Sequence, residues 1–82
     1  SYYEAVQSLR DAERRVALYN SQSRLASGSL SIMLKSFSAG EGTLADLLLV
    51  RRQLNDYEQG RIEAVADYNT SVALIKQILA YE

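Results

Sequence analysis

Apolar residues recur at alternating steps of three and four along the first half of the chain. The series runs from Tyr2 to Phe37, and ten of its eleven positions are apolar, with Ser23 the exception. Five consecutive heptads at 3.5 residues per repeat are typical of a helix in a left-handed coiled coil. We therefore predict one helix over residues 2–38, with a seam made up of Tyr2, Ala5, Leu9, Ala12, Val16, Tyr19, Ser23, Ala26, Leu30, Met33 and Phe37.

One clear turn signal interrupts the apolar pattern, at residues 39–43. Gly40 can adopt the left-handed conformation that ends a helix, and Thr43 can cap the next helix. Asp46 follows Thr43 by three residues, which is the spacing of a capping box. A second helix is predicted over residues 44–80, with the apolar series Leu47, Leu48, Leu54, Tyr57, Ile62, Val65, Tyr68, Val72, Ile75 and Leu79.

Two glycines and a serine-rich segment disfavour helix within the two predicted helices. Residues 20–31 contain Gly28 and five serines, which lower helix propensity, but the apolar register continues unbroken through them. Gly60 indicates either a close approach of the two helices or only a loss of helix propensity. The complete absence of proline agrees with long helices. The predicted fold is all-α, a long antiparallel two-helix coiled-coil hairpin.

Composition narrows the possible functions. The chain has no Cys and no His, so it lacks thiol nucleophiles, zinc ligands and Ser-His-Asp triads, and we expect neither an enzyme nor a bound cofactor or metal. Nine basic residues against ten acidic residues provide no excess of positive charge for nucleic acid. No stretch approaches the roughly 20 apolar residues that a membrane-spanning helix needs, and residues 1–10 do not resemble a signal peptide.

The apolar run at the start of the second helix predicts association. Leu44, Leu47, Leu48, Leu49 and Val50 point in almost every direction around the helix, and one partner helix cannot cover them all. The hairpin is therefore expected to associate into a larger helical bundle. For the isolated chain, we expect a dimer that forms an antiparallel four-helix bundle.

The stretch from Phe37 to Leu54 resembles the periplasmic turn of outer-membrane efflux channels, the TolC family. Residues 12–19 and 63–74 are similar to the family's descending and returning helices, and the ending is closer to the C-terminal of its two repeats. Leu49 departs from the pattern by replacing a second Asp, Val50 and Arg51 replace Ala-Gln, and Glu41 stands at an often apolar position. The matching positions are Phe37, Gly40, Asp46, Leu47, Leu48, Arg52 and Leu54.

The resemblance implies a passive export channel. Family members are trimers whose helices form a periplasmic tunnel below a barrel of strands in the outer membrane. An inner-membrane pump drives substrates through a periplasmic adaptor into this tunnel. The present chain would be a fragment, the lower part of one hairpin in the periplasm of a Gram-negative cell. It would reach the membrane only through other parts of the parent protein.

The candidate functional residues surround the turn. The resemblance implies that the tip docks the adaptor, although an ordinary interhelical turn needs the same glycines. Asp46 would contribute to a cation-selective ring in the trimer, or serve only at the helix start. The two arginines would pair with neighbouring hairpins to close the aperture, or form a solvated face. The docking tip comprises Ala39, Gly40, Glu41, Gly42 and Thr43, and the aperture residues are Asp46, Arg51 and Arg52.

A second function class remains open from the sequence. A generic coiled-coil interaction module would self-associate through the heptad surfaces and the apolar run at residues 44–50. The two hypotheses differ in the parent gene, because a channel would carry a secretory signal and amphipathic strands upstream.

Overall fold

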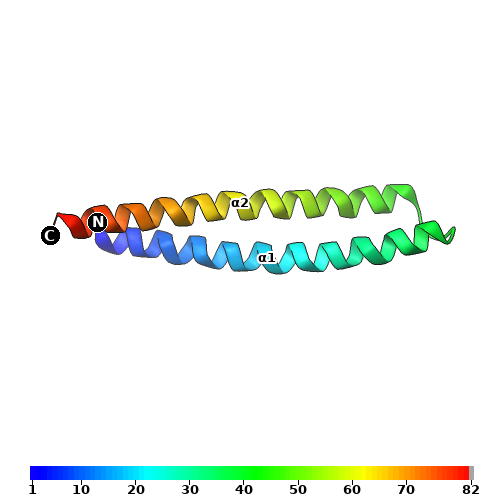
Figure 1. Ribbon diagram of the computed structural model, residues 1–82, viewed down its shortest axis with the longest axis horizontal. Coiled ribbons are helices and arrows are strands. Elements are labelled where there is room, and N and C mark those ends of the chain that lie inside the picture. Colours follow the sequence, from blue (N-terminus) through cyan, green and yellow to red (C-terminus); the bar gives the residue numbers. More distant parts are fainter. Residues whose placement is uncertain (82) are drawn as a thin grey trace.

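The computed structural model describes residues 1–81 and contains two helices of equal length. Helix α1 comprises Tyr2–Ser38 and helix α2 comprises Leu44–Ala80. They pack antiparallel along their whole length, so that both termini lie at one end and the turn at the other (Figure 1). The molecule measures 65 × 14 × 14 Å. The predicted all-α hairpin is confirmed, and no strand occurs in the described residues.

Helix α1 is continuous through its serine-rich segment. Ser1 caps its N-terminus, with Oγ accepting a hydrogen bond from the Glu4 backbone N–H at 3.4 Å. Residues 20–31 remain helical, and Gly28 lies on the exposed surface. The unbroken contact with α2 explains this continuity, because packing of the seam outweighs a local propensity cost of about 1 kcal/mol for one glycine.

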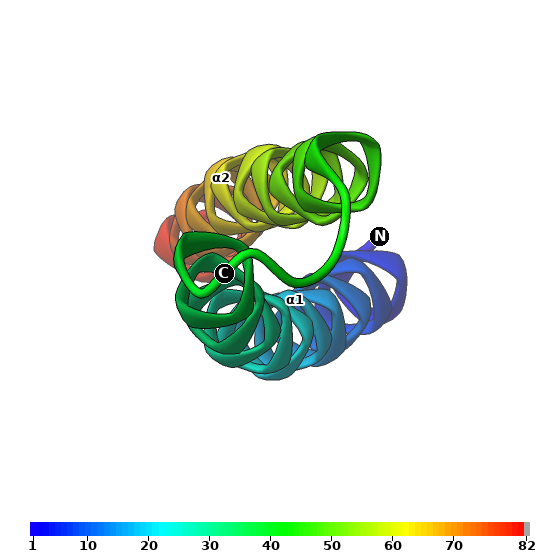
Figure 2. The same cartoon turned by 90° about the vertical axis from the view of Figure 1, so that its right-hand side faces the viewer.

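The predicted seam of α1 faces α2. Its alanines Ala5, Ala12 and Ala26 are buried, with at most 9% of their surface exposed. The larger seam residues between them are half-buried, whereas Tyr2 and Phe37 at the two ends are exposed. Seen from the turn end, the helices lie side by side with no third layer (Figure 2). Within residues 1–81, small residues therefore form the fully covered part of the interface.

Four residues of the α2 apolar series lie outside the interface with α1. Leu48, Ile62, Val65 and Leu79 are exposed to solvent, at 38–57% of their surface. The inner positions also alternate by three and four, but they include polar and small residues that hydropathy alone does not select. These inner positions are Leu47, Val50, Leu54, Tyr57, Arg61, Ala64, Tyr68, Ser71, Ile75 and Ile78.

Tyr19 occupies a seam position of α1 where neighbouring heptads have alanine, and Gly60 makes room for its ring. A β-carbon added to Gly60 would lie 2.7 Å from Cε1 and Cζ of Tyr19, which is well inside van der Waals contact. The close contact at Gly60 is therefore made by the Tyr19 side chain and not by the backbone of α1, so the expected close approach of the helices takes the form of a side chain packed on the glycine. The Tyr19 ring occupies space that the β-carbon of any other residue at position 60 would need.

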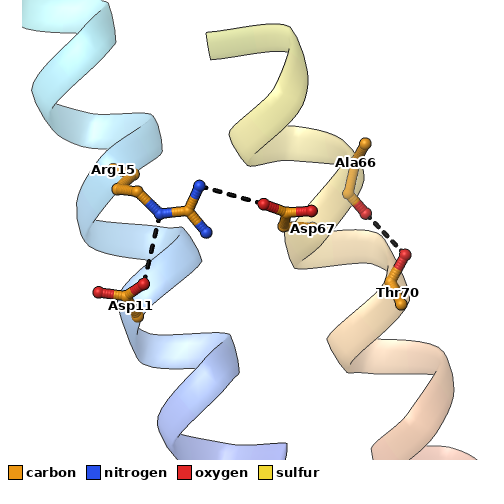
Figure 3. A network of polar contacts seen from close by, with 5 residues as sticks. All are labelled: Asp11, Arg15, Ala66, Asp67 and Thr70. Atoms are coloured by element: carbon orange, nitrogen blue, oxygen red, sulfur yellow. Dashed lines mark hydrogen bonds and ion pairs between the residues drawn. The ribbon is translucent and has the colours of Figure 1, made fainter. Parts of the chain in front are cut away.

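Arg15 connects the two helices through charge (Figure 3). Its Nη1 donates a hydrogen bond to Asp67 Oδ2 at 3.1 Å, and its Nε lies 3.4 Å from Asp11 Oδ2 on the same helix. The hydrogen bond to Asp67 and the nearby carboxylates raise the pKa of the guanidinium above its ordinary value, against the effect of desolvation. This stabilisation is fully present below the ordinary arginine pKa, so Arg15 stays charged throughout the neutral range.

Alanine substitutions at Gly28 and Gly60 distinguish the effect of side-chain packing on stability from the effect of helix propensity. No atom lies within 4 Å of a β-carbon at Gly28, so Gly28→Ala should raise the free energy of unfolding by about 0.5–1 kcal/mol. Gly60→Ala should raise the free energy of unfolding by less than Gly28→Ala does, or should lower it, because the added methyl group displaces the Tyr19 ring. Urea denaturation measures both changes. The difference between the two sites should disappear in a Tyr19→Ala background, and its persistence there would contradict the proposed contact.

Candidate functional site

The turn between the helices begins with a C-terminal capping motif. The Gly40 N–H donates to the carbonyl of Phe37 at 3.0 Å, and the Glu41 N–H donates to that of Ser36 at 2.8 Å. These two bonds make up a Schellman motif, which satisfies carbonyl groups left free at the end of α1. Gly40 has a φ of 84°, in the left-handed region that side chains with a β-carbon avoid. Local backbone chemistry thus specifies where α1 ends.

A second left-handed glycine leads into α2. Gly42 has a φ of 79°, and Thr43 follows in an extended conformation. Thr43 Oγ1 accepts a hydrogen bond from the Asp46 backbone N–H at 3.2 Å. Within residues 1–81, the Asp46 carboxylate makes no hydrogen bond, so only one half of the predicted capping box forms. The carboxylate still interacts favourably with the positive end of the α2 dipole.

Part of the predicted tip surrounds a small hollow between the helix ends. Glu41, Gly42, Thr43 and Asp46 line it together with apolar side chains from both helices, and its volume is about 60 Å³. Ala39 and Gly40 do not line it, although they lie in the same exposed turn. The apolar lining includes Met33, Phe37 and Leu47. Phe37 and Leu47 belong to the turn sequence that resembles the efflux-channel family, whereas Met33 was expected only as a seam residue.

The predicted aperture residues lie apart from one another on α2. Arg51 and Arg52 are exposed, do not line the hollow, and form no ion pair with any residue in the described part of the chain. Asp46 precedes Arg51 by five residues and Arg52 by six, which is more than one helical turn. A helix rotates by about 100° per residue, so Asp46, Arg51 and Arg52 lie on different sides of α2. In a single hairpin they do not form one cluster.

The only ion pair between the helices lies far from this site, within the residues that the structure describes. The spacing of Asp11 and Arg15, four residues apart, indicates an ion pair within α1. The second partner, Asp67, is revealed only by the antiparallel register of the two helices. Arg15 and Asp67 line a shallow groove with Ser8 and Thr70, in which every lining side chain is polar.

Metal-binding and membrane-spanning features are absent from the described residues. No group of three or more acidic, histidine or cysteine side chains is arranged to hold a metal ion within residues 1–81. Neither helix, over the same residues, combines the length and hydropathy needed to cross a bilayer. Comparison with known proteins found no matching protein family, no matching curated protein and no matching solved structure. The interpretation of the site therefore depends on its own geometry and on the resemblance of the turn sequence.

The left-handed glycines should determine the stability of the turn. Gly40→Ala and Gly42→Ala should each lower the free energy of unfolding by about 1–2 kcal/mol, because a β-carbon is disfavoured in the left-handed region. Gly40→Asn should cost less, because asparagine tolerates this conformation. Thermal and urea unfolding followed by circular dichroism would measure the three variants. Equal stabilities of Gly40→Ala and Gly40→Asn would show that backbone strain does not control the turn.

Proposed function

We propose that this hairpin is the turn end of the periplasmic tunnel in an outer-membrane efflux channel. In this proposal its tip docks the periplasmic adaptor, and the parent protein is a trimer that exports substrates passively from an inner-membrane pump. The observation that carries the proposal is the turn from Phe37 to Leu54, which resembles the family pattern and stands exposed at the end of a 65 Å rod.

The backbone of the tip supports a docking role. Gly40 and Gly42 are exposed, and no atom lies within 4 Å of a β-carbon built at either position. A partner can therefore approach the main chain closely from the end of the hairpin. Glu41 between them contributes an exposed carboxylate, which favours a polar or basic contact on the partner over a wholly apolar one.

The charge of Asp46 supports a role at a trimeric aperture. Its carboxylate is exposed and accepts no hydrogen bond within residues 1–81, so it does not have to break a bond to face a pore. Three copies around an axis would make a ring of carboxylates, which attracts cations and repels anions. Arg51 and Arg52 have no ion pair partner in the described residues and would be available to carboxylates of neighbouring hairpins.

A self-associating interaction module is the second candidate function. It is favoured by large apolar side chains that remain exposed away from the turn, among them Leu25 at 70% and Ile32 at 67%. The parent gene distinguishes the two candidates. A channel requires an upstream secretory signal and amphipathic strands, whereas an interaction module requires neither.

In the full-length parent, Gly40→Trp should abolish export while leaving the trimer intact. The indole would strain a left-handed backbone and obstruct a close partner at the tip. The control is Gly28→Trp, at a glycine that is equally open but lies in the middle of α1. Export is measured by efflux of a fluorescent substrate, and assembly by cross-linking. Normal export by Gly40→Trp would exclude the tip as the docking surface.

Asp46→Asn should weaken cation selectivity with little loss of stability. The cap hydrogen bond is donated by the backbone N–H of Asp46, so this substitution preserves it and removes only the charge, which contributes about 0.3–1 kcal/mol at a helix start. Conductance of the parent channel in planar bilayers, with and without divalent cations, measures the effect. Unchanged selectivity together with a lowered melting temperature would reduce Asp46 to a helix-start residue.

A further inference from the structure

One stretch of α1, between its middle and the turn, has few stabilising features of its own. Residues 20–31 include five serines and Gly28, which favour helix less than alanine does. Within residues 1–81, no side chain of this stretch makes a hydrogen bond or an ion pair. The helix here therefore depends on its contact with α2.

The seam of α1 is also weakest in this stretch. Ser23 occupies a seam position, and its Oγ is buried without a hydrogen-bond partner in the described part of the chain. A hydroxyl in this state has lost its hydrogen bonds to water and gained none in return, which disfavours the packed helix. Of the other two seam positions, Ala26 is small, and only Leu30 at the end of the stretch has a large apolar side chain.

Helix α2 does not compensate for the polar seam residue. The bond between Arg15 and Asp67 defines which residues of the two helices lie level. By this register Ser23 lies between the inner positions Tyr57 and Arg61 of α2, two residues from each. Arg61 makes no ion pair within residues 1–81, and a guanidinium favours water over an apolar contact. The interface thus buries little apolar surface at this level.

The parts of the hairpin on either side are held more firmly. Toward the termini, Ala12 and Ala64 are fully buried, and the ion pair of Arg15 crosses the interface. Toward the turn, Met33 and Leu47 line one hollow, and the capping motif at the end of α1 is complete. A local opening over residues 20–31 therefore breaks fewer interactions than an opening of the same length on either side.

We propose that residues 20–31 of α1 are a hinge segment, at which the hairpin opens locally while the parts on both sides stay paired. A two-helix rod without such a segment is most stable in its middle and frays from its open end. The hinge segment reverses this order and allows the turn end to bend relative to the end with the termini. This behaviour does not depend on the export function.

Hydrogen exchange of the 82-residue chain tests the order of opening. Residues 9–20 are the matched comparison, because they lie as far from the middle of α1 as residues 20–31 do, on the side of the open end. After correction for intrinsic rates, the amides of residues 20–31 should exchange about ten-fold faster than those of residues 9–20. Equal or slower exchange of residues 20–31 would overturn the hinge, because fraying alone predicts that result.

Two serine variants test whether the seam causes the opening. Ser23→Ala removes the buried hydroxyl, and Ser21→Ala makes the same change on the exposed surface, with the same gain in helix propensity. Ser23→Ala should slow the exchange of residues 20–31 several-fold more than Ser21→Ala does. Equal effects of the two variants would overturn the role assigned to the seam.

Limited digestion with trypsin gives an independent measure. Arg24 is exposed and is the only basic residue in the hinge segment. Cleavage within a helix requires local unfolding, so the first cut should follow Arg24. In Ser23→Ala this cut should be slower several-fold. A first cut at Arg10 or Lys76, near the open end, would overturn the hinge in favour of fraying.

Discussion

One line of contact between two helices provides all the burial in this fold, and the size of the residues on that line controls the structure. With no third element, a large side chain on the seam always keeps one edge in water. Among residues 1–81, the buried positions are therefore alanines and one serine, Ser71. The alanines let the helices approach closely, and the larger seam residues pack around them. The hydrophobic contribution of this interface is spread thinly over the whole 65 Å length.

Two specific contacts select the register within that uniform seam. A heptad pattern alone permits the helices to slide by seven residues, because each step restores the same type of contact. The fit of Tyr19 over Gly60 and the bond from Arg15 to Asp67 are both lost in a shifted register. The register in turn specifies which residues of α1 lie level with which residues of α2.

The turn is specified differently, by hydrogen bonds within a few residues. The Schellman motif at Gly40 and the Thr43 cap need no contact from the rest of the hairpin. The sequence predicts their positions because glycine is typical of a left-handed helix end and threonine is typical of a helix N-cap. The sequence does not predict that Glu41 and Asp46 line one hollow, because this depends on how the ends of α1 and α2 meet.

The sequence by itself determined the two helices, the turn and the inner seam of α1, because each of these follows from local propensity or from a single unambiguous period. Only the tertiary structure decided which side of α2 faces inward. Two stripes on α2 have helical spacing, and the more apolar residues, such as Leu48 and Ile62, lie outside. The inner stripe contains Ala64 and Ser71, whose small size suits a close helix contact although their hydropathy is modest. Complementary shape between two surfaces decided the packing, and one helix's sequence does not contain that information.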